Sequence, residues 1–476
     1  ARAPNTEVPN AFGGALDTSN SALVDWHEFF EDPQLVALIE VALENNQELN
    51  IMVQEMLVTE SEIMARRGEY LPRLGIGGGA GIERVGSHSS QGASDEHVGL
   101  RRDLQDYRIG LFASWEVDVW RSLRNLRDAA VHRYLASVEG RNFMITRLVA
   151  EIANLYYELL ALDAQQEVIV NSIALQESAL ELVRFQLQSA RVTMLAVTRF
   201  EAQLRGFQAV QFEIAQQIVE RENRLNFLLG RFPQPIPRNS ADFLTREPVA
   251  VSAGLPAQLL ENRPDVRQAE LQLEAASLDV RAARARFYPA LRLEAGVGLN
   301  STNIRNLISP GSIIYGLFAN ILAPLFNRND ITAQYFASNA IQMQAVLVYE
   351  QAILGAYVEV MTSLSRINNL RSMFELKEQQ VTRLTESIDI SNSLFNSARA
   401  DYLEVLTTRR DALEAQIELI EIRRLQLSAS VEVYRALGGG WRSAGDAAET
   451  STREATADTP PGSTDESADT TAAGEE

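Results

Sequence analysis

The chain has 476 residues, a formal net charge of −20, four histidines and no cysteine. Without cysteine, disulfides, thiolate metal sites and cysteine nucleophiles are excluded, and the histidines show no metal-site spacing, so no metal or cofactor is expected. The negative charge argues against a nucleic-acid partner, because phosphate binding needs a clustered basic surface. No apolar run reaches about 18 residues, so no helix is expected to cross a bilayer.

The sequence contains an internal repeat. The segment Leu43–Leu49 reappears 217 positions later as Leu260–Val266, and the same shift carries Pro72 to Pro289. Near the end of each half the shift becomes 208, which carries Leu195 to Leu403. Insertions in loops produce such a change of shift, so a duplication is favoured over chance. Each half is predicted to run helix, strand, loop, strand, long helix, turn, long helix.

Two very long helices are predicted, one in each half. No proline lies between Pro72 and Pro233 or between Pro324 and Pro460, and proline breaks helix interiors. A helix of roughly 65 residues is about 100 Å long. Apolar residues recur every seven positions, which is typical of coiled-coil packing. One such row consists of Ile145, Ile152, Leu159, Gln166, Ile173, Leu180 and Leu187, and a second runs from Val346 to Ile388. These helices alone would equally suit a coiled-coil structural protein.

Four segments alternate apolar and polar or small residues, which predicts strands with one apolar face. They lie at about 73–85, 106–119, 290–301 and 312–324. Each is about 10 residues, the length of a tilted transmembrane strand, although a soluble sandwich alternates in the same way. Four strands cannot close a barrel, and open edges are not tolerated in lipid. If the strands meet lipid, three protomers would pool twelve of them.

The third of these segments shows the expected division of faces. Leu291, Leu293, Val297 and Leu299 alternate with polar or small residues and are predicted to face lipid. The intervening Arg292 and Glu294 are predicted to face the lumen.

Several motifs resemble the TolC-type outer membrane factors, specifically the drug-efflux branch that works with resistance–nodulation–division pumps. They are Trp26–Leu35, Ser114–Trp120, Leu322–Phe326, Asp401–Leu406 and Ala436–Trp441. The resemblance covers about Asp25 to Trp441, and the motifs are specific only in combination.

The resemblance implies a mixed fold. It consists of a trimeric outer-membrane β-barrel with four strands per protomer, continued by a long periplasmic α-helical barrel. The implied location is the outer membrane of a Gram-negative bacterium, in contact with its lipid. The implied partners are two further copies of the chain, a periplasmic adaptor protein and an inner-membrane pump. The implied function is passive conduction of drugs or other small amphiphiles; type I protein secretion and metal-ion efflux use the same fold.

The expected organisation follows the repeat. Residues 1–24 are predicted to be irregular, 25–240 to form the first repeat and 241–441 the second. Residues 442–476 hold nine acidic residues against two arginines and are predicted to be a disordered tail, because this composition cannot bury a core.

A gate is expected where the long helices turn back. The resemblance places Leu403 at this turn, where three copies would form an apolar ring. It also places Thr407 where an aspartate is usual, which weakens the case for an acidic ring. Asp401 and Glu404 could supply charge if they point inward. Arg409 and Arg410 could hold the closed state by pairing with acidic groups on neighbouring helices, each exposed pair being worth about 0–1 kcal/mol.

No enzyme is expected. Nucleophile-elbow, P-loop and dinucleotide signatures are absent from any strand–turn–helix context. The glycine-rich run Gly77–Gly81 lies inside an alternating strand, where close packing explains it better than phosphate binding.

Truncation after Trp441 is expected to leave folding and transport intact, because the tail lacks apolar residues that could dock. The trimer of the truncated protein would be weighed in detergent, and loss of the trimer would contradict the prediction.

Overall fold

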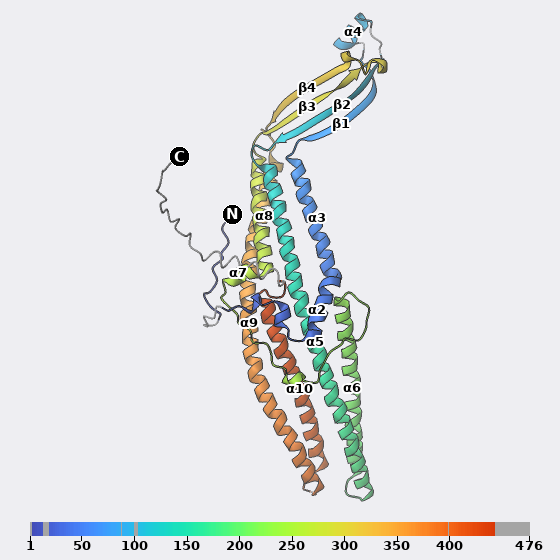
Figure 1. Cartoon of the computed structure of the whole chain (residues 1–476), viewed down its shortest axis with the longest axis vertical. Helices are drawn as coiled ribbons and strands as arrows, with labels where there is room; N and C mark the ends of the chain where they lie inside the picture. The colour runs from blue at the N-terminus through green and yellow to red at the C-terminus, as the bar shows by residue number, and fades with distance from the viewer. Residues whose placement is uncertain (1, 13–18, 87, 100–102, 398, 443–476) are drawn as a thin grey trace, which may run out of the picture. The chain divides into compact units, whose positions relative to one another are not determined.

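The computed structural model describes residues 2–12, 19–86, 88–99, 103–397 and 399–442. Apart from Arg442, the predicted tail lies outside these residues. The chain divides into two compact units, each built from segments of both sequence halves (Figure 1). The first unit comprises Ala1–Val8, Glu48–Asn142 and Pro264–Gly355, and the second comprises Pro9–Gln47, Phe143–Arg263 and Ala356–Glu476.

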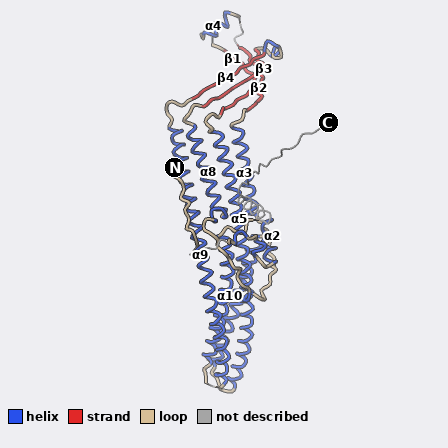
Figure 2. Tube along the Cα trace, turned by 60° about the vertical axis from the view of Figure 1, so that its left-hand side comes forward, coloured by secondary structure: helices blue, strands red, loops and turns tan. Residues whose placement is uncertain are grey.

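The first unit holds one antiparallel sheet, drawn in red in Figure 2. Its four strands follow chain order (Figure 1). The strands are β1 (Arg73–Arg84), β2 (Asp103–Val117), β3 (Ala290–Ser301) and β4 (Ile313–Leu322). Five α-helices complete this unit wholly or in part: α3 (Gln47–Glu69), α4 (Ser90–His97), α8 (Pro264–Ala285), and the beginnings of α5 (Ser122–Gln188) and α9 (Asn329–Asn396). The predicted number of strands is therefore confirmed. Helix α4 was not predicted, because its polar sequence has no apolar stripe.

The second unit is helical in the residues described. It contains the remainder of α5 and α9 together with α1 (Trp26–Phe29), α2 (Pro33–Asn45), α6 (Met194–Leu228), α7 (Gln258–Asn262) and α10 (Tyr402–Ala436). Its α5 residues carry the predicted seam: Ile152, Leu159 and Leu180 are buried. The same row includes Gln166, which is only partly buried. The heptad prediction therefore identified a packed helix face.

The internal repeat is visible in element lengths. Strands β1 and β3 both have 12 residues and start 217 positions apart. Helices α6 and α10 both have 35 residues and start 208 positions apart. The longest helices, α5 and α9, have 67 and 68 residues. The two shifts in the sequence thus correspond to two pairs of elements of equal length, and the loops between them differ in length between the halves.

The glycine after each of the two 35-residue helices has the same structural role. Gly230 has φ +66° and Gly438 has φ +89°, a left-handed conformation that favours glycine. A Cβ atom at Gly230 would lie 2.2 Å from the carbonyl oxygen of Asn45, and one at Gly438 would lie 2.6 Å from that of Asn262. Asn45 and Asn262 are themselves related by the shift of 217. In both halves, therefore, the glycine that follows the helix packs closely against the carbonyl group of the repeated asparagine.

Helix α9 is long and apolar enough to cross a membrane by length and composition alone, with a mean hydropathy of 1.2 over 18 residues. The boundary of the predicted tail needs correction. Arg442 was assigned to the tail, but its Nη2 donates to Oδ1 of Asn262 at 2.7 Å. A truncation after Arg442 keeps this bond and is the cleaner test of the tail.

Replacing Gly438 with alanine is expected to destabilise the protein by at least about 1–2 kcal/mol, because the left-handed conformation is unfavourable for residues with a Cβ atom. Gly206→Ala in α6 is the matched control. Among the described residues outside its own helical turns, no atom lies within 4 Å of a Cβ added there, and alanine in a helix interior stabilises by about 0.5–1 kcal/mol. Thermal unfolding of the trimer in detergent measures both changes, and equal shifts would refute the role assigned to Gly438.

Candidate functional site

The strand register gathers the predicted apolar rows on one face of the sheet. Leu293 pairs with Trp115 on one side and with Ala319 on the other. Two positions along, Ala295 pairs with Ala113, which in turn pairs with Leu74 of β1. Side chains of directly paired residues lie on the same face of a sheet. All four rows therefore form one continuous apolar surface that crosses every strand.

The four residues predicted to face lipid belong to this apolar face. Leu291, Leu293, Val297 and Leu299 pair on β2 with Val117, Trp115, Leu111 and Ile109, respectively. The side chain of Val297 is 52% exposed in the protomer.

The opposite face carries charge. Arg292 Nη2 donates to Glu116 Oε2 at 2.9 Å across the β2–β3 pair. Further along the same pair of strands, Asn300 Nδ2 donates to Asp106 Oδ1 at 3.1 Å. Arg292 lies on the face opposite the leucines, as expected, because successive side chains of a strand point to opposite faces of the sheet.

The glycine run of β1 packs against an aromatic ring. A Cβ atom at Gly77 would lie 3.1 Å from the ring of Phe112, and one at Gly296 would lie 3.4 Å from the same ring. Phe112 thus lies over glycines on both neighbouring strands. The sequence signalled close packing at this run but could not identify the ring that requires it.

Tryptophans tie the ends of the strands to their neighbours. Trp115 Nε1 donates to the carbonyl oxygen of Tyr70 at 3.0 Å, and Trp120 Nε1 donates to that of Pro289 at 2.9 Å. Between them, Asp118 accepts backbone N–H bonds from Leu123 at 3.1 Å and from Arg124 at 2.9 Å. These residues explain the Ser114–Trp120 motif, which ends one strand and caps the first turn of α5.

Four of the predicted gate residues lie in the first three turns of α10, and the fifth, Asp401, is the N-cap residue that precedes the helix. Leu403, Thr407 and Arg410 follow at spacings of four and three residues, so they share one stripe of the helix. Leu403 is 45% exposed, and Leu195, its counterpart in α6, is 57% exposed. Both leucines remain outside the cluster in which Leu406 packs against buried residues of α5 and α6.

The charged residues predicted at the gate behave differently from one another. Asp401 is the N-cap residue of α10, but its side chain makes no capping bond. Glu404 is exposed, and Thr407 is partly buried. Arg410 pairs with acids of its own helix, with Nη2 at 2.9 Å from Asp411 and Nε at 3.7 Å from Glu414.

The contacts of Arg409 differ from those expected. It was expected to pair with acids on neighbouring helices, but Nη1 donates to the carbonyl oxygen of Leu175 at 3.3 Å and Nη2 to Oδ1 of Asn392 at 3.2 Å. Burial lowers the pKa of this guanidinium. Arg409 thus joins α10 to α5 and α9 through neutral acceptors.

No group of three or more metal-binding side chains occurs in the part of the chain that the structure describes. The features of the site are therefore surfaces: an apolar sheet face, a charged sheet face and two exposed leucines beside the helix turns.

The chain is similar to known proteins over most of its length. A family model described as outer membrane efflux protein matches residues 38–231 and 255–439. The solvent efflux pump outer membrane protein SrpC of Pseudomonas putida is 30% identical over 440 residues, covering 90% of this chain and 91% of that protein. The pyoverdine export outer membrane protein OpmQ of Pseudomonas aeruginosa is 30% identical over 431 residues, covering 90% of each. The crystal structure of a membrane protein from Pseudomonas aeruginosa has a TM-score of 0.85 at 25% identity, covering 92% of this chain and 99% of that one.

These matches confirm the predicted fold and location. The protein is a trimeric channel of the Gram-negative outer membrane that extends into the periplasm and works with a periplasmic adaptor and an inner-membrane pump. The chain belongs to the outer membrane efflux protein family.

Proposed function

We propose that the channel conducts drugs or other small amphiphilic molecules from the pump–adaptor complex to the outside, passively and without catalysing a reaction. The observation that carries this proposal is the continuous apolar face of the sheet, backed by a charged opposite face. A sheet of this kind suits a wall between lipid and an aqueous lumen, in which a solute needs no dedicated binding site. The named relatives export a solvent and pyoverdine, which are both small organic molecules.

In this proposal Leu291, Leu293, Val297 and Leu299 contact lipid. Their face carries no charged side chain on β3, whereas the intervening Arg292 and Glu294 do carry charge. A charged group costs much less in a wet lumen than in hydrocarbon. The alternation therefore orients the sheet with its charged face toward the lumen.

The gate is assigned to the exposed leucines beside the helix turns. Leu403 is half-exposed although it is large and apolar, and it is followed on its stripe by Thr407 and Arg410. In a trimer, three copies of Leu403 would form an apolar ring that narrows and dewets the pore. Asp401 and Glu404 flank this leucine on the first turn of the helix and supply acidic charge beside the ring.

Because Val297 lies on the apolar face, Val297→Arg is expected to impair assembly in the outer membrane far more than Glu294→Arg. Arginine on a lipid-facing strand near the midplane costs about 2–4 kcal/mol, whereas an arginine facing the lumen remains hydrated. The yield of trimer in the outer-membrane fraction measures the difference. Similar yields for the two variants would show that the faces have been assigned the wrong way round.

Leu403→Ser is expected to raise the resting conductance in planar bilayers, because a hydroxyl-lined constriction holds water where a leucine ring excludes it. Cells carrying the variant should also admit large antibiotics more readily. Leu376→Ser, a matched change at another exposed leucine in the middle of α9, should leave both measurements unchanged. An unaltered conductance for Leu403→Ser would place the constriction elsewhere.

A further inference from the structure

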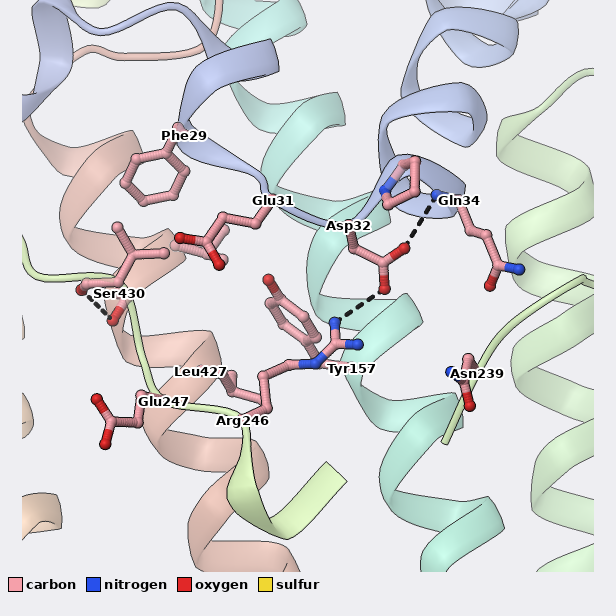
Figure 3. A pocket seen from close by; sticks show the side chains of 13 residues that line it. Phe29, Glu31, Asp32, Gln34, Tyr157, Asn239, Arg246, Glu247, Leu427 and Ser430 are labelled. Carbon is pink, nitrogen blue, oxygen red and sulfur yellow. Dashed lines mark hydrogen bonds and ion pairs between the residues drawn. The ribbon is translucent and has the colours of Figure 1, made fainter. Parts of the chain in front are cut away.

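A pocket in the second unit is formed where the start of α2, the middle of α5, the 239–249 loop and the end of α10 come together (Figure 3). Its volume is about 390 Å³, within the range of small-molecule sites. One wall is apolar and consists of the buried side chains of Phe29, Leu427 and Val431. The other lining groups are mainly polar or charged.

One polar side of the pocket is internally paired. Arg246 Nη1 donates to Asp32 Oδ2 at 2.8 Å, and the hydroxyl of Tyr156 donates to the same oxygen at 2.8 Å. The backbone N–H of Gln34 donates to Asp32 Oδ1 at 2.9 Å. Burial raises the pKa of Asp32, but the hydrogen bonds from Arg246, Tyr156 and Gln34 outweigh it and hold the pKa below its usual value. This side is therefore a rigid, satisfied structural element.

Among the remaining polar groups, Ser430 donates to the carbonyl oxygen of Val249 at 3.2 Å, whereas Tyr157, Glu31 and Glu247 have no such partner among the described residues. Tyr157 is only 7% exposed, yet its hydroxyl makes no hydrogen bond within the described chain and points into the pocket toward Glu31 (Figure 3). Glu31 and Glu247 form no ion pair with any described residue. Arg423 attracts Glu247 electrostatically but forms no ion pair with it. The guanidinium of Arg423 lies 3.8 Å from the centre of the Phe374 ring.

We propose that this pocket binds a small organic cation, a primary ammonium that carries an aromatic or alkyl group. The lining carries three carboxylates, from Glu31, Asp32 and Glu247, against the single guanidinium of Arg246. The ammonium group donates to Glu31 and to the hydroxyl oxygen of Tyr157, and Glu247 adds negative potential from the rim. The apolar part of the ligand covers the wall of Phe29, Leu427 and Val431.

The protonation states suit this role. Burial, reinforced by the charges of Asp32 and Glu31 and only partly offset by Arg246, raises the pKa of Tyr157 to about 12. The phenol is therefore neutral at physiological pH, and its oxygen lone pairs can accept an N–H bond while its own proton is donated to a carboxylate. This binding goes beyond conduction and does not depend on it.

Isothermal titration calorimetry on the detergent-solubilised trimer tests the proposal, with 2-phenylethylammonium as the probe. The expected result is saturable binding of one probe per protomer. Two molecules of similar shape, the neutral 2-phenylethanol and the anionic phenylacetate, should not bind at the same concentrations. Equal binding of all three, or no binding of the ammonium at millimolar concentration, would overturn the proposal.

Variants then locate the site. Glu31→Gln should weaken binding roughly tenfold, because it removes a hydrogen bond to a charged group. Tyr157→Phe, which removes only the unpartnered hydroxyl, should weaken it several-fold. Glu44→Gln removes one negative charge from an exposed position of α2 outside the pocket and should bind like the unaltered protein. If all three variants bind equally well, the cation is held elsewhere and the assignment fails.

The alternative occupant of the pocket is a lysine or arginine side chain of a neighbouring protomer, which carries the same positive charge. In that case the assembled trimer would exclude the probe, and a trimer structure would show a protein side chain at Tyr157. Either result would overturn the proposal of a small-molecule site. The single-channel conductance of Tyr157→Phe should equal that of the unaltered protein. Failure of the binding proposal would therefore not count against the proposed conduction of solutes.

Discussion

The need to satisfy backbone hydrogen bonds in lipid governs the architecture of this chain. A sheet of four strands in the order β1-β2-β3-β4 has two open edges, one on β1 and one on β4. In hydrocarbon, each unpaired N–H or C=O group costs several kcal/mol, so an edge must be closed by another strand. The sheet is therefore incomplete in one protomer, and trimerisation completes it. In the proposed orientation, the apolar face that Leu293, Ala113 and Leu74 share becomes part of a continuous outer belt.

The two units meet different physical demands. In the proposed orientation, the sheet of the first unit presents a nearly uniform apolar face, which its strands build from small and apolar residues. On the opposite face, Phe112 packs over Gly77 and Gly296. The second unit is water-exposed and can use polar contacts in its core. Arg409 and the Asp32–Arg246–Tyr156 group join separate helices through hydrogen bonds there. Polar networks of this kind favour one packing arrangement to the extent that their members are satisfied.

Duplication gives each protomer two similar but unequal hairpins. Helices α6 and α10 have equal lengths, and both end at a left-handed glycine that packs on a repeated asparagine carbonyl. Their first turns differ in chemistry: Leu403 is followed four residues later by Thr407, whereas Leu195 is followed by Arg199. A trimer would therefore present two kinds of helix turn to a pore or to a partner. We expect the difference to matter for closure, because the structural framework is repeated and only the exposed residues vary.

Sequence periodicity by itself determined much of this protein. The period of two in β3, the seven-residue seam through Ile152 and Leu159, and the shifts of 217 and 208 all concern local or repeated patterns, which backbone geometry converts directly into elements. The residues of the proposed gate, such as Leu403, were found only through resemblance to a known family. What the tertiary structure decided was pairing between distant segments. The register that sets Leu293 beside Trp115, the ring of Phe112 over Gly77, the acceptors of Arg409 and the pocket around Tyr157 each join residues far apart in the chain. Such contacts depend on how packed elements meet in space, and no periodicity within one element specifies its partner.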